Sequence, residues 1–251
     1  GKGGDAALFS GYALAAFSLQ AAHTRDDVAL HRALASLRGV YYLTHVAGRG
    51  VIARCAFPSA NALSWNYPRR WRSRLSVDRA FVGHTPEPIP GPPLLHPLDT
   101  PFPPSTYYTR GTKDQLTGLL FGLSVAWHVL GDHPAARATI AEIVHDLYEH
   151  LVAFDWYIRD ANGKNATNAD FVTGLLRTQL LALYRHTSGD PKIQELYEDE
   201  YTTGGYRNTL NVFNNATEYF AHNLRAARFF STWLLSTDEE SKTELAEGFL
   251  D

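Results

Sequence analysis

The chain has few of the features that mark several common protein classes. Its 251 residues include one cysteine, Cys55, so an internal disulfide is impossible. A formal net charge of -3 gives no overall attraction to nucleic acid. Charged or polar residues interrupt every helical stretch, and no apolar run reaches the roughly 18 residues that a membrane span requires. We therefore expect neither a nucleic-acid partner nor a membrane.

Motifs for cofactors and metals are also lacking. The 11 histidines are scattered, and none shows zinc-type spacing with Cys55. The sequence contains no His-Glu-x-x-His, no Gly-rich phosphate loop and no Gly-x-Ser-x-Gly. We therefore expect no metal and no cofactor.

Methionine is absent from all 251 residues, including the first position, and no signal peptide is recognisable. We therefore expect that the chain could be a fragment of a longer protein. The single cysteine fits a reducing compartment, yet many exported bacterial proteins also lack disulfides. Cytoplasmic, periplasmic and secreted locations all stay open.

The most informative feature that is present is a repeat. Asp-Gln-Leu-Thr-Gly-Leu-Leu at 114–120 recurs as Asp-Phe-Val-Thr-Gly-Leu-Leu at 170–176. Each copy continues as an apolar helical pattern to a Gly-Asp pair, and a shorter helix with proline near its start follows. A looser copy begins at Asp5, and a weaker one near Glu218. Such internal self-similarity indicates a repeat architecture, here of helical hairpins.

The apolar periodicity predicts helices over about 6–22, 27–46, 113–130, 134–153, 170–187, 191–201 and 209–235, and another from about 239. In both clear repeats the first helix is apolar all round and the second is amphipathic. An all-apolar helix must be buried on every side, which favours inner and outer rings. We therefore predict an all-α fold, with antiparallel hairpins forming an α/α toroid in one domain over 1–251. The sequence shows about four hairpins, whereas a closed toroid usually has six. We therefore expect that the chain is incomplete or that some of its helices are poorly marked in the sequence.

A segment over 49–111 breaks the helical pattern. Nine of the 13 prolines fall within 86–104, which excludes regular helix there. Loops of this length inside a compact domain are usually functional or disordered. Because the segment is also rich in arginine and aromatic residues, we predict a long, ordered loop excursion across one face of the domain.

Aspartates recur at the starts of the predicted inner helices, at Asp5, Asp114 and Asp170. In a double ring these helix ends gather around one cleft. Aspartate is also a preferred N-cap, so each could be purely structural. Asp114 is the strongest functional candidate because it adjoins Lys113, Gln115 and Arg110, and the nearby cations are expected to hold it ionised.

The excursion supplies candidate ligand-binding residues. Arginine side chains recognise carboxylate, sulfate or phosphate, and aromatic faces stack on sugar rings or flat ligands. Arg54 is placed at the rim of the cleft by this interpretation. The stacking candidates are Trp65, Trp71, Tyr108 and Trp156. The alternative is a solvated basic loop whose aromatic residues pack on the domain.

The chain resembles the α/α-toroid carbohydrate-active enzymes of bacteria, which include glycosidases, polysaccharide lyases and sugar 2-epimerases. The segments that carry this resemblance are 4–11, 50–54, 112–118 and 156–164. The resemblance covers most of the chain, but it matches no single family's catalytic signature. It is a likeness of architecture, which is weak support for a particular chemistry.

The resemblance implies an enzyme that acts on an oligo- or polysaccharide, most simply a glycoside hydrolase. Asp114 would be a catalytic carboxylate, with Asp5 or Asp170 as its partner. The expected substrate-binding residues are Arg54, Trp65, Trp71, Tyr108, Arg110, Lys113, Gln115 and Trp156. Two alternatives stay open: a polysaccharide lyase with Tyr108 or a histidine as base, and a non-catalytic helical-repeat module that binds a glycan or a protein.

Overall fold

The computed structural model describes residues 5–58, 82–93, 95, 97–160, 162–164, 171–202, 219–237 and 239–250. These residues are mostly helical, which confirms the sequence prediction at this level. The helices are α1 (Ala6–Thr24), α2 (Asp27–His45), α4 (Lys113–Val129), α5 (Pro134–Ala153), α6 (Leu175–Ser188), α7 (Pro191–Thr202), α9 (Tyr219–Leu235) and α10 (Glu239–Leu250). No helix among the described residues is long and apolar enough to cross a membrane.

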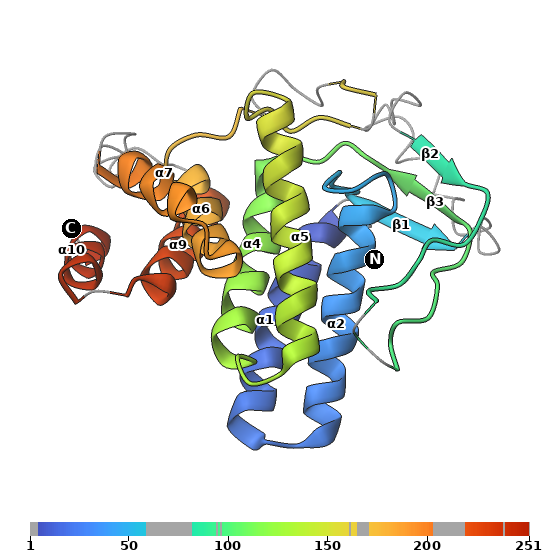
Figure 1. The fold of residues 1–251 in the computed structure, drawn as a ribbon, viewed down its shortest axis with the longest axis horizontal. Helices are drawn as coiled ribbons and strands as arrows, with labels where there is room; N and C mark the ends of the chain where they lie inside the picture. Colours follow the sequence, from blue (N-terminus) through green and yellow to red (C-terminus); the bar gives the residue numbers. More distant parts are fainter. Residues whose placement is uncertain are drawn as a thin grey trace.

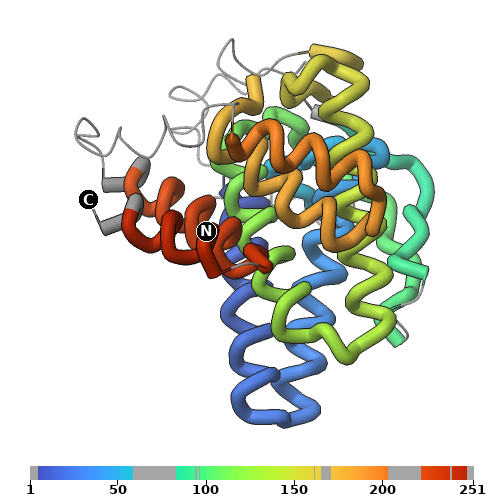
Figure 2. Tube along the Cα trace, turned by 60° about the vertical axis from the view of Figure 1, so that its left-hand side comes forward, coloured from blue at the N-terminus to red at the C-terminus, as the bar shows by residue number. Residues whose placement is uncertain are grey.

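The helices pack as consecutive pairs: α1 with α2, α4 with α5, α6 with α7 and α9 with α10. Helix α4 also contacts α1, α6 and α9, so first helices of different pairs lie against one another (Figures 1 and 2). Figure 1 shows α1 and α4 running side by side, with the turns that lead into α2 and α5 at the same lower end. The N-terminal ends of α1 and α4 therefore share the opposite end.

Glycines bring α1 and α4 unusually close together. A Cβ atom placed on Gly11 would lie 1.8 Å from the carbonyl oxygen of Gly118. One placed on Gly122 would lie 2.2 Å from the carbonyl oxygen of Gly11. Since backbone atoms cannot yield as a flexible side chain can, only glycine fits at this crossing. The Thr-Gly of the repeat at 117–118 thus serves close helix packing, which fixes the separation of the two helix starts.

The excursion contains a small antiparallel sheet that the sequence analysis did not predict. Its strands are β1 (Cys55–Pro58), β2 (Val82–Thr85) and β3 (Ser105–Tyr108), in the order β1-β3-β2. Cys55 and Val82 both pair with Tyr108, on opposite edges of β3. Each strand has four residues, which is too short for an alternating pattern to stand out.

Side chains of α2 hold the excursion in place. Arg38 donates through Nε to the carbonyl oxygen of Leu98 at 2.7 Å, and its guanidinium lies 4.0 Å from the ring centre of Phe102. Tyr42 stacks on Phe102 at 4.4 Å and hydrogen-bonds Ser105. Residues 98–105 are therefore an ordered layer on α2.

The predicted helix over 170–187 begins later than expected, at Leu175. Gly174 has φ 55° and ψ -136°, values that no helix contains, and it precedes the first turn. The backbone N–H of Val172 donates to the carbonyl oxygen of Trp156 at 2.7 Å, so extended pairing holds this segment outside the helix. The second copy of the repeat therefore differs in structure from the first. Asp170 itself lies outside the described residues, as do residues 209–218 of the predicted helix over 209–235.

Candidate functional site at the N-terminal ends of α1 and α4

Asp5 precedes α1 and lies beside two side chains from distant parts of the chain. Its Oδ1 accepts from Nη2 of Arg54 at 2.8 Å and from Nε2 of Gln115 at 3.1 Å. Asp5 occupies the N-cap position, yet its side chain makes no capping hydrogen bond. The purely structural role of an N-cap therefore does not apply to Asp5, whose carboxylate is turned toward Arg54 and Gln115 instead.

Arg54 is positioned by its own backbone. Its N–H donates to the carbonyl oxygen of Tyr108 at 2.7 Å, and its carbonyl oxygen accepts from the N–H of Ala7 at 3.1 Å. These two bonds hold the Arg54 backbone between Tyr108 at the end of β3 and Ala7 in the first turn of α1. Its side chain is 24% exposed, and that of the paired Asp5 is 45% exposed. The ion pair is thus accessible to a ligand.

Gln115 is buried and links the start of α4 to Asp5. Its Oε1 accepts from the backbone N–H of Thr112 at 3.0 Å and from the Thr112 hydroxyl at 2.5 Å. A glutamine that returns to the N-cap N–H in this way is one half of a capping box. Because the amide oxygen is held by Thr112, the amide NH2 must point toward Asp5. Gln115 therefore orients the Asp5 carboxylate.

Asp114 lies in the first turn of α4, one residue after Lys113 and two after the N-cap Thr112. Burial raises the pKa of Asp114 above its ordinary value, although the charges of Arg228, Arg54 and Lys113 oppose that rise. Asp5 adds to the rise by repulsion. The net shift of the Asp114 pKa is therefore upward, opposite to the effect of the neighbouring cations, because the loss of solvent outweighs them.

Arg228 on α9 completes this group and was not predicted from the sequence. Its Nε donates to the hydroxyl oxygen of Thr117 at 2.8 Å, and the Thr117 hydroxyl donates to the carbonyl oxygen of Lys113 at 2.7 Å. Burial lowers the pKa of Arg228 to about 10, with Asp114 opposing the fall, so the side chain stays cationic at neutral pH. The available signal was a pair of arginines, Arg225 and Arg228, in the helical stretch of the weakest repeat.

Several predicted binding residues flank this group. Tyr108 ends β3 and is bound through its backbone to Arg54. Arg110 lies in the three-residue segment between β3 and Thr112, the N-cap of α4, and Lys113 is the first residue of α4. Both are partly exposed. The structure thus brings Tyr108, Arg110 and Lys113 to the same end as Asp5 and Asp114.

Trp156 follows α5 at that end of the hairpins, but other side chains already stack on its ring. The Arg177 guanidinium lies 4.1 Å from the ring centre, and Tyr148 meets the ring edge-on at 5.9 Å. A sugar could stack on the face of Trp156 that Arg177 covers only if Arg177 moved. The remaining predicted residues, Asp170, Trp65 and Trp71, lie outside the described residues.

The assembled group combines two carboxylates of different character with several cations. Burial raises the pKa of Asp114 above its ordinary value, and Asp5 is paired with the Arg54 guanidinium. A pair of titratable groups whose environments separate their protonation is typical of acid–base catalysis. Arg54, Lys113 and Arg228 provide positive charge that suits an anionic substrate.

Comparisons with protein-family models, curated proteins and solved structures found no match to this chain. The site therefore has to be interpreted from its own residues.

Proposed function

We propose that the protein is a carbohydrate-active enzyme that hydrolyses glycosidic bonds. The observation that carries this proposal is the meeting of Asp5 and Asp114 at the starts of two helices that glycines hold together. Glycoside hydrolysis by the common route uses two carboxyl groups, one protonated and one ionised. The raised pKa of Asp114 and the Arg54 partner of Asp5 suit that division.

In the proposed mechanism, Asp114 is the general acid that protonates the oxygen of the departing sugar. Asp5 is the second carboxylate, which assists attack on the anomeric carbon or stabilises the positive charge that develops there. Gln115 is a positioning residue, since it donates to Asp5 and its own oxygen is fixed by Thr112. Arg54 also positions Asp5, because its Nη2 donates to the Asp5 carboxylate.

The cations around the carboxylates favour an acidic substrate, such as an oligo- or polysaccharide that contains uronic acid. Arg54 is partly exposed, and Lys113 and Arg110 lie at the same end of the molecule. Arginine and lysine bind carboxylate groups by charge-assisted hydrogen bonds. A uronate carboxylate between them would orient the sugar over Asp114.

The proposed architecture is part of an α/α toroid, with α1, α4, α6 and α9 as inner helices and α2, α5, α7 and α10 as outer helices. Contacts of α4 with α1, α6 and α9, and of α6 with α9, support this assignment. So does the pairing of each proposed inner helix with the outer helix that follows it. The candidate site would then lie where inner-helix N-termini converge.

A panel of neutral and acidic polysaccharides tests the proposal, with reducing ends and unsaturated-uronate absorbance followed together. A hydrolase releases reducing ends without new absorbance, and Asp114→Asn should abolish the release. The exposed Asp27 at the far end of the α1–α2 hairpin offers the matched control, Asp27→Asn, which should stay active. Activity retained in Asp114→Asn would remove Asp114 from the mechanism.

A lyase is the second candidate, favoured by the cations and by Tyr108 beside Arg54. Neutralising a uronate carboxylate makes its neighbouring C–H acidic enough for a tyrosine base to remove the proton. A lyase would raise the reducing-end and absorbance signals together. Silence across the panel would favour a non-catalytic glycan- or protein-binding module.

A further inference from the structure

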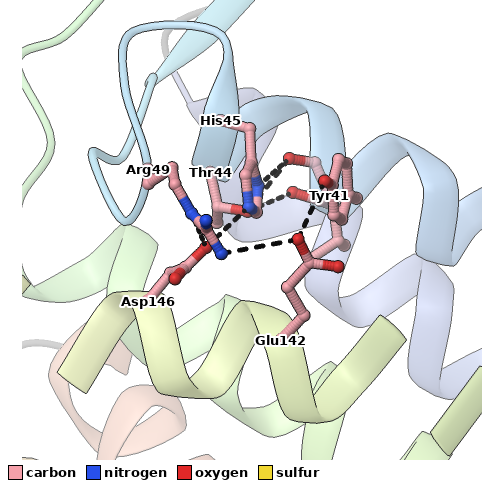
Figure 3. A network of polar contacts seen from close by, with 7 residues as sticks. Tyr41, Thr44, His45, Arg49, Glu142 and Asp146 are labelled. Carbon is pink, nitrogen blue, oxygen red and sulfur yellow. Dashed lines mark hydrogen bonds and ion pairs between the residues drawn. The ribbon is translucent and has the colours of Figure 1, made fainter. Parts of the chain in front are cut away.

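A second polar cluster joins the end of α2 to the middle of α5 (Figure 3). His45 is the last residue of α2, and Glu142 and Asp146 lie one turn apart on α5. His45 Nε2 lies 3.0 Å from Asp146 Oδ2, and Arg49 Nε donates to the same oxygen at 2.9 Å. Nη2 of Arg49 is 3.6 Å from Glu142 Oε1. One guanidinium therefore bridges both carboxylates.

The backbone after α2 presses this cluster together. Gly48 and Gly50 have φ values of 129° and 73°, which residues other than glycine rarely adopt. A Cβ atom on Gly50 would lie 2.1 Å from the carbonyl oxygen of Asp146. The turn is therefore in direct contact with α5, and Arg49 between the two glycines is placed over the carboxylates.

The His45 ring is oriented as a metal-binding imidazole is. Its Nδ1 lies 2.8 Å from the carbonyl oxygen of Tyr41, and since a carbonyl can only accept, Nδ1 carries a hydrogen. The ring also stacks on Tyr41 at 3.8 Å with an interplanar angle of 8°. Nε2 consequently points at Asp146. Histidines that bind metals usually donate the other ring N–H to a carbonyl or carboxylate in this manner.

We propose that His45, Glu142 and Asp146 form a site for a divalent transition-metal ion of the Zn²⁺ class. One atom from each residue lies within 4.8 Å of the others. Tetrahedral zinc with bonds of about 2.1 Å brings ligand atoms to about 3.4 Å from one another, so a modest contraction is needed. An imidazole with two carboxylates is a ligand set that suits such ions.

The side chains that must move to admit a metal ion are the more exposed ones. The Glu142 side chain is 28% exposed and that of Arg49 is 69% exposed, whereas His45 and Asp146 are each 7% exposed. Glu142 would turn inward, and the metal would take the place of the Arg49 guanidinium between the carboxylates. Arg49 would move into solvent, and water would complete the coordination. Bound metal would then clip α2 to α5 and stabilise the folded state.

Titration with Co²⁺ tests the site, because the visible absorption of protein-bound Co²⁺ reports a specific coordination geometry. The unchanged protein should bind one Co²⁺ that Zn²⁺ displaces, and Zn²⁺ should raise its melting temperature. His45→Gln should weaken binding at least tenfold. His31→Gln, at an exposed position on α2, is the matched control and should change nothing. This control matters because a chain with 11 histidines can bind metals adventitiously.

Two further variants keep the test decisive. Glu142→Gln alters a partly exposed residue, so it should fold even if His45→Gln does not, and it should weaken binding about tenfold. Arg49→Ala removes the competing cation and should tighten binding about tenfold. Binding that survives both His45→Gln and Glu142→Gln would overturn the proposal. So would failure of the unchanged protein to bind, whatever Arg49→Ala did.

Discussion

In two clusters of the described residues an aspartate lies close to arginine. The pKa values of the two aspartates, Asp114 and Asp146, are shifted in opposite directions. At the starts of α1 and α4, burial raises the pKa of Asp114 in spite of Arg228 and Arg54. Between α2 and α5, burial also raises the pKa of Asp146, but hydrogen bonds from His45 and Arg49 outweigh it and lower the pKa below its ordinary value.

The difference lies in direct bonding and not in the number of nearby charges. Asp146 Oδ2 accepts at 2.9 Å from Arg49 and lies 3.0 Å from His45. Arg228 on α9, the charge that lowers the pKa of Asp114 most, instead gives its Nε–H to Thr117. A cation that donates elsewhere acts on a carboxylate only through space, which desolvation overcomes more easily. Under the proposed function, this contrast suits proton transfer at Asp114, whereas the direct bonds of Asp146 hold α2 against α5.

The largest effect that would separate the two clusters is on turnover. Asp5→Asn removes one of the two carboxyl groups from the candidate site, and we expect kcat/KM to fall about 1,000-fold, or ~4 kcal/mol in transition-state stabilisation. Asp146→Asn should leave kcat/KM within about twofold of the unchanged protein. Steady-state kinetics on a substrate found in the panel measures both, and equal losses in the two variants would erase the functional distinction between the clusters.

The next largest effect is expected on stability, when a side chain is introduced where α1 and α4 pack closely. Gly118→Ala would place a Cβ atom 2.6 Å from the carbonyl oxygen of Leu8, so we expect a loss of about 3 kcal/mol in the free energy of unfolding. Gly39→Ala is the matched control, because a Cβ atom there meets nothing within 4 Å. Alanine at that helical position should stabilise the protein by about 0.5–1 kcal/mol. Urea unfolding measures both, and a Gly118→Ala variant as stable as the parent would contradict the packing.

A change in the Asp146 cluster should alter the free energy of unfolding and not the turnover. Asp146→Asn leaves the buried His45 without its carboxylate partner and should lower the free energy of unfolding by about 2 kcal/mol at neutral pH. Because folding lowers the pKa of Asp146, its contribution is fully present above the unfolded pKa of about 4 and is lost as pH falls through the folded pKa. Unfolding curves from pH 7 to pH 3 should therefore converge for the two proteins. A constant gap over that range would assign the effect to something other than this charge.

The smallest expected effect is a change in pH dependence. The Arg228 charge lowers the pKa of Asp114, so Arg228→Met should raise that pKa further. An acid catalyst must be protonated, and activity is lost as pH rises through its pKa, so the alkaline limb of the profile should move to higher pH. Arg25→Met, at an exposed position after α1, is the control and should leave the limb in place. A limb that moved to lower pH in Arg228→Met would contradict the assigned electrostatics.

The helices were predictable where their signals are local. Thr112 with Gln115 marks the start of α4, and Pro134 marks that of α5; both predicted starts are confirmed. The start of α6 was missed because a positive φ at Gly174 and a backbone bond to Trp156 act across distant segments. The four-residue strands were missed for a similar reason, since their partners lie 20–53 residues away.

The candidate site could be predicted as residues but not as contacts. Asp5, Arg54 and Gln115 were each identified from the sequence, but their meeting depends on the glycine-mediated approach of α1 and α4. Arg228 was missed because it belongs to the weakest repeat, and the His45–Asp146 pair because 101 residues separate its members. In each case the contact is formed by tertiary packing, which the local sequence pattern does not encode.

The most direct test of the account is a carbon-13 NMR titration of the aspartate carboxyl groups in the unchanged protein, with Asp114→Asn and Asp146→Asn used for assignment. We expect Asp114 to titrate above the ordinary aspartate pKa and Asp146 below it. Asp114 titrating at or below the value of Asp146 would contradict the account, because the two clusters would then not differ in their capacity to hold a proton.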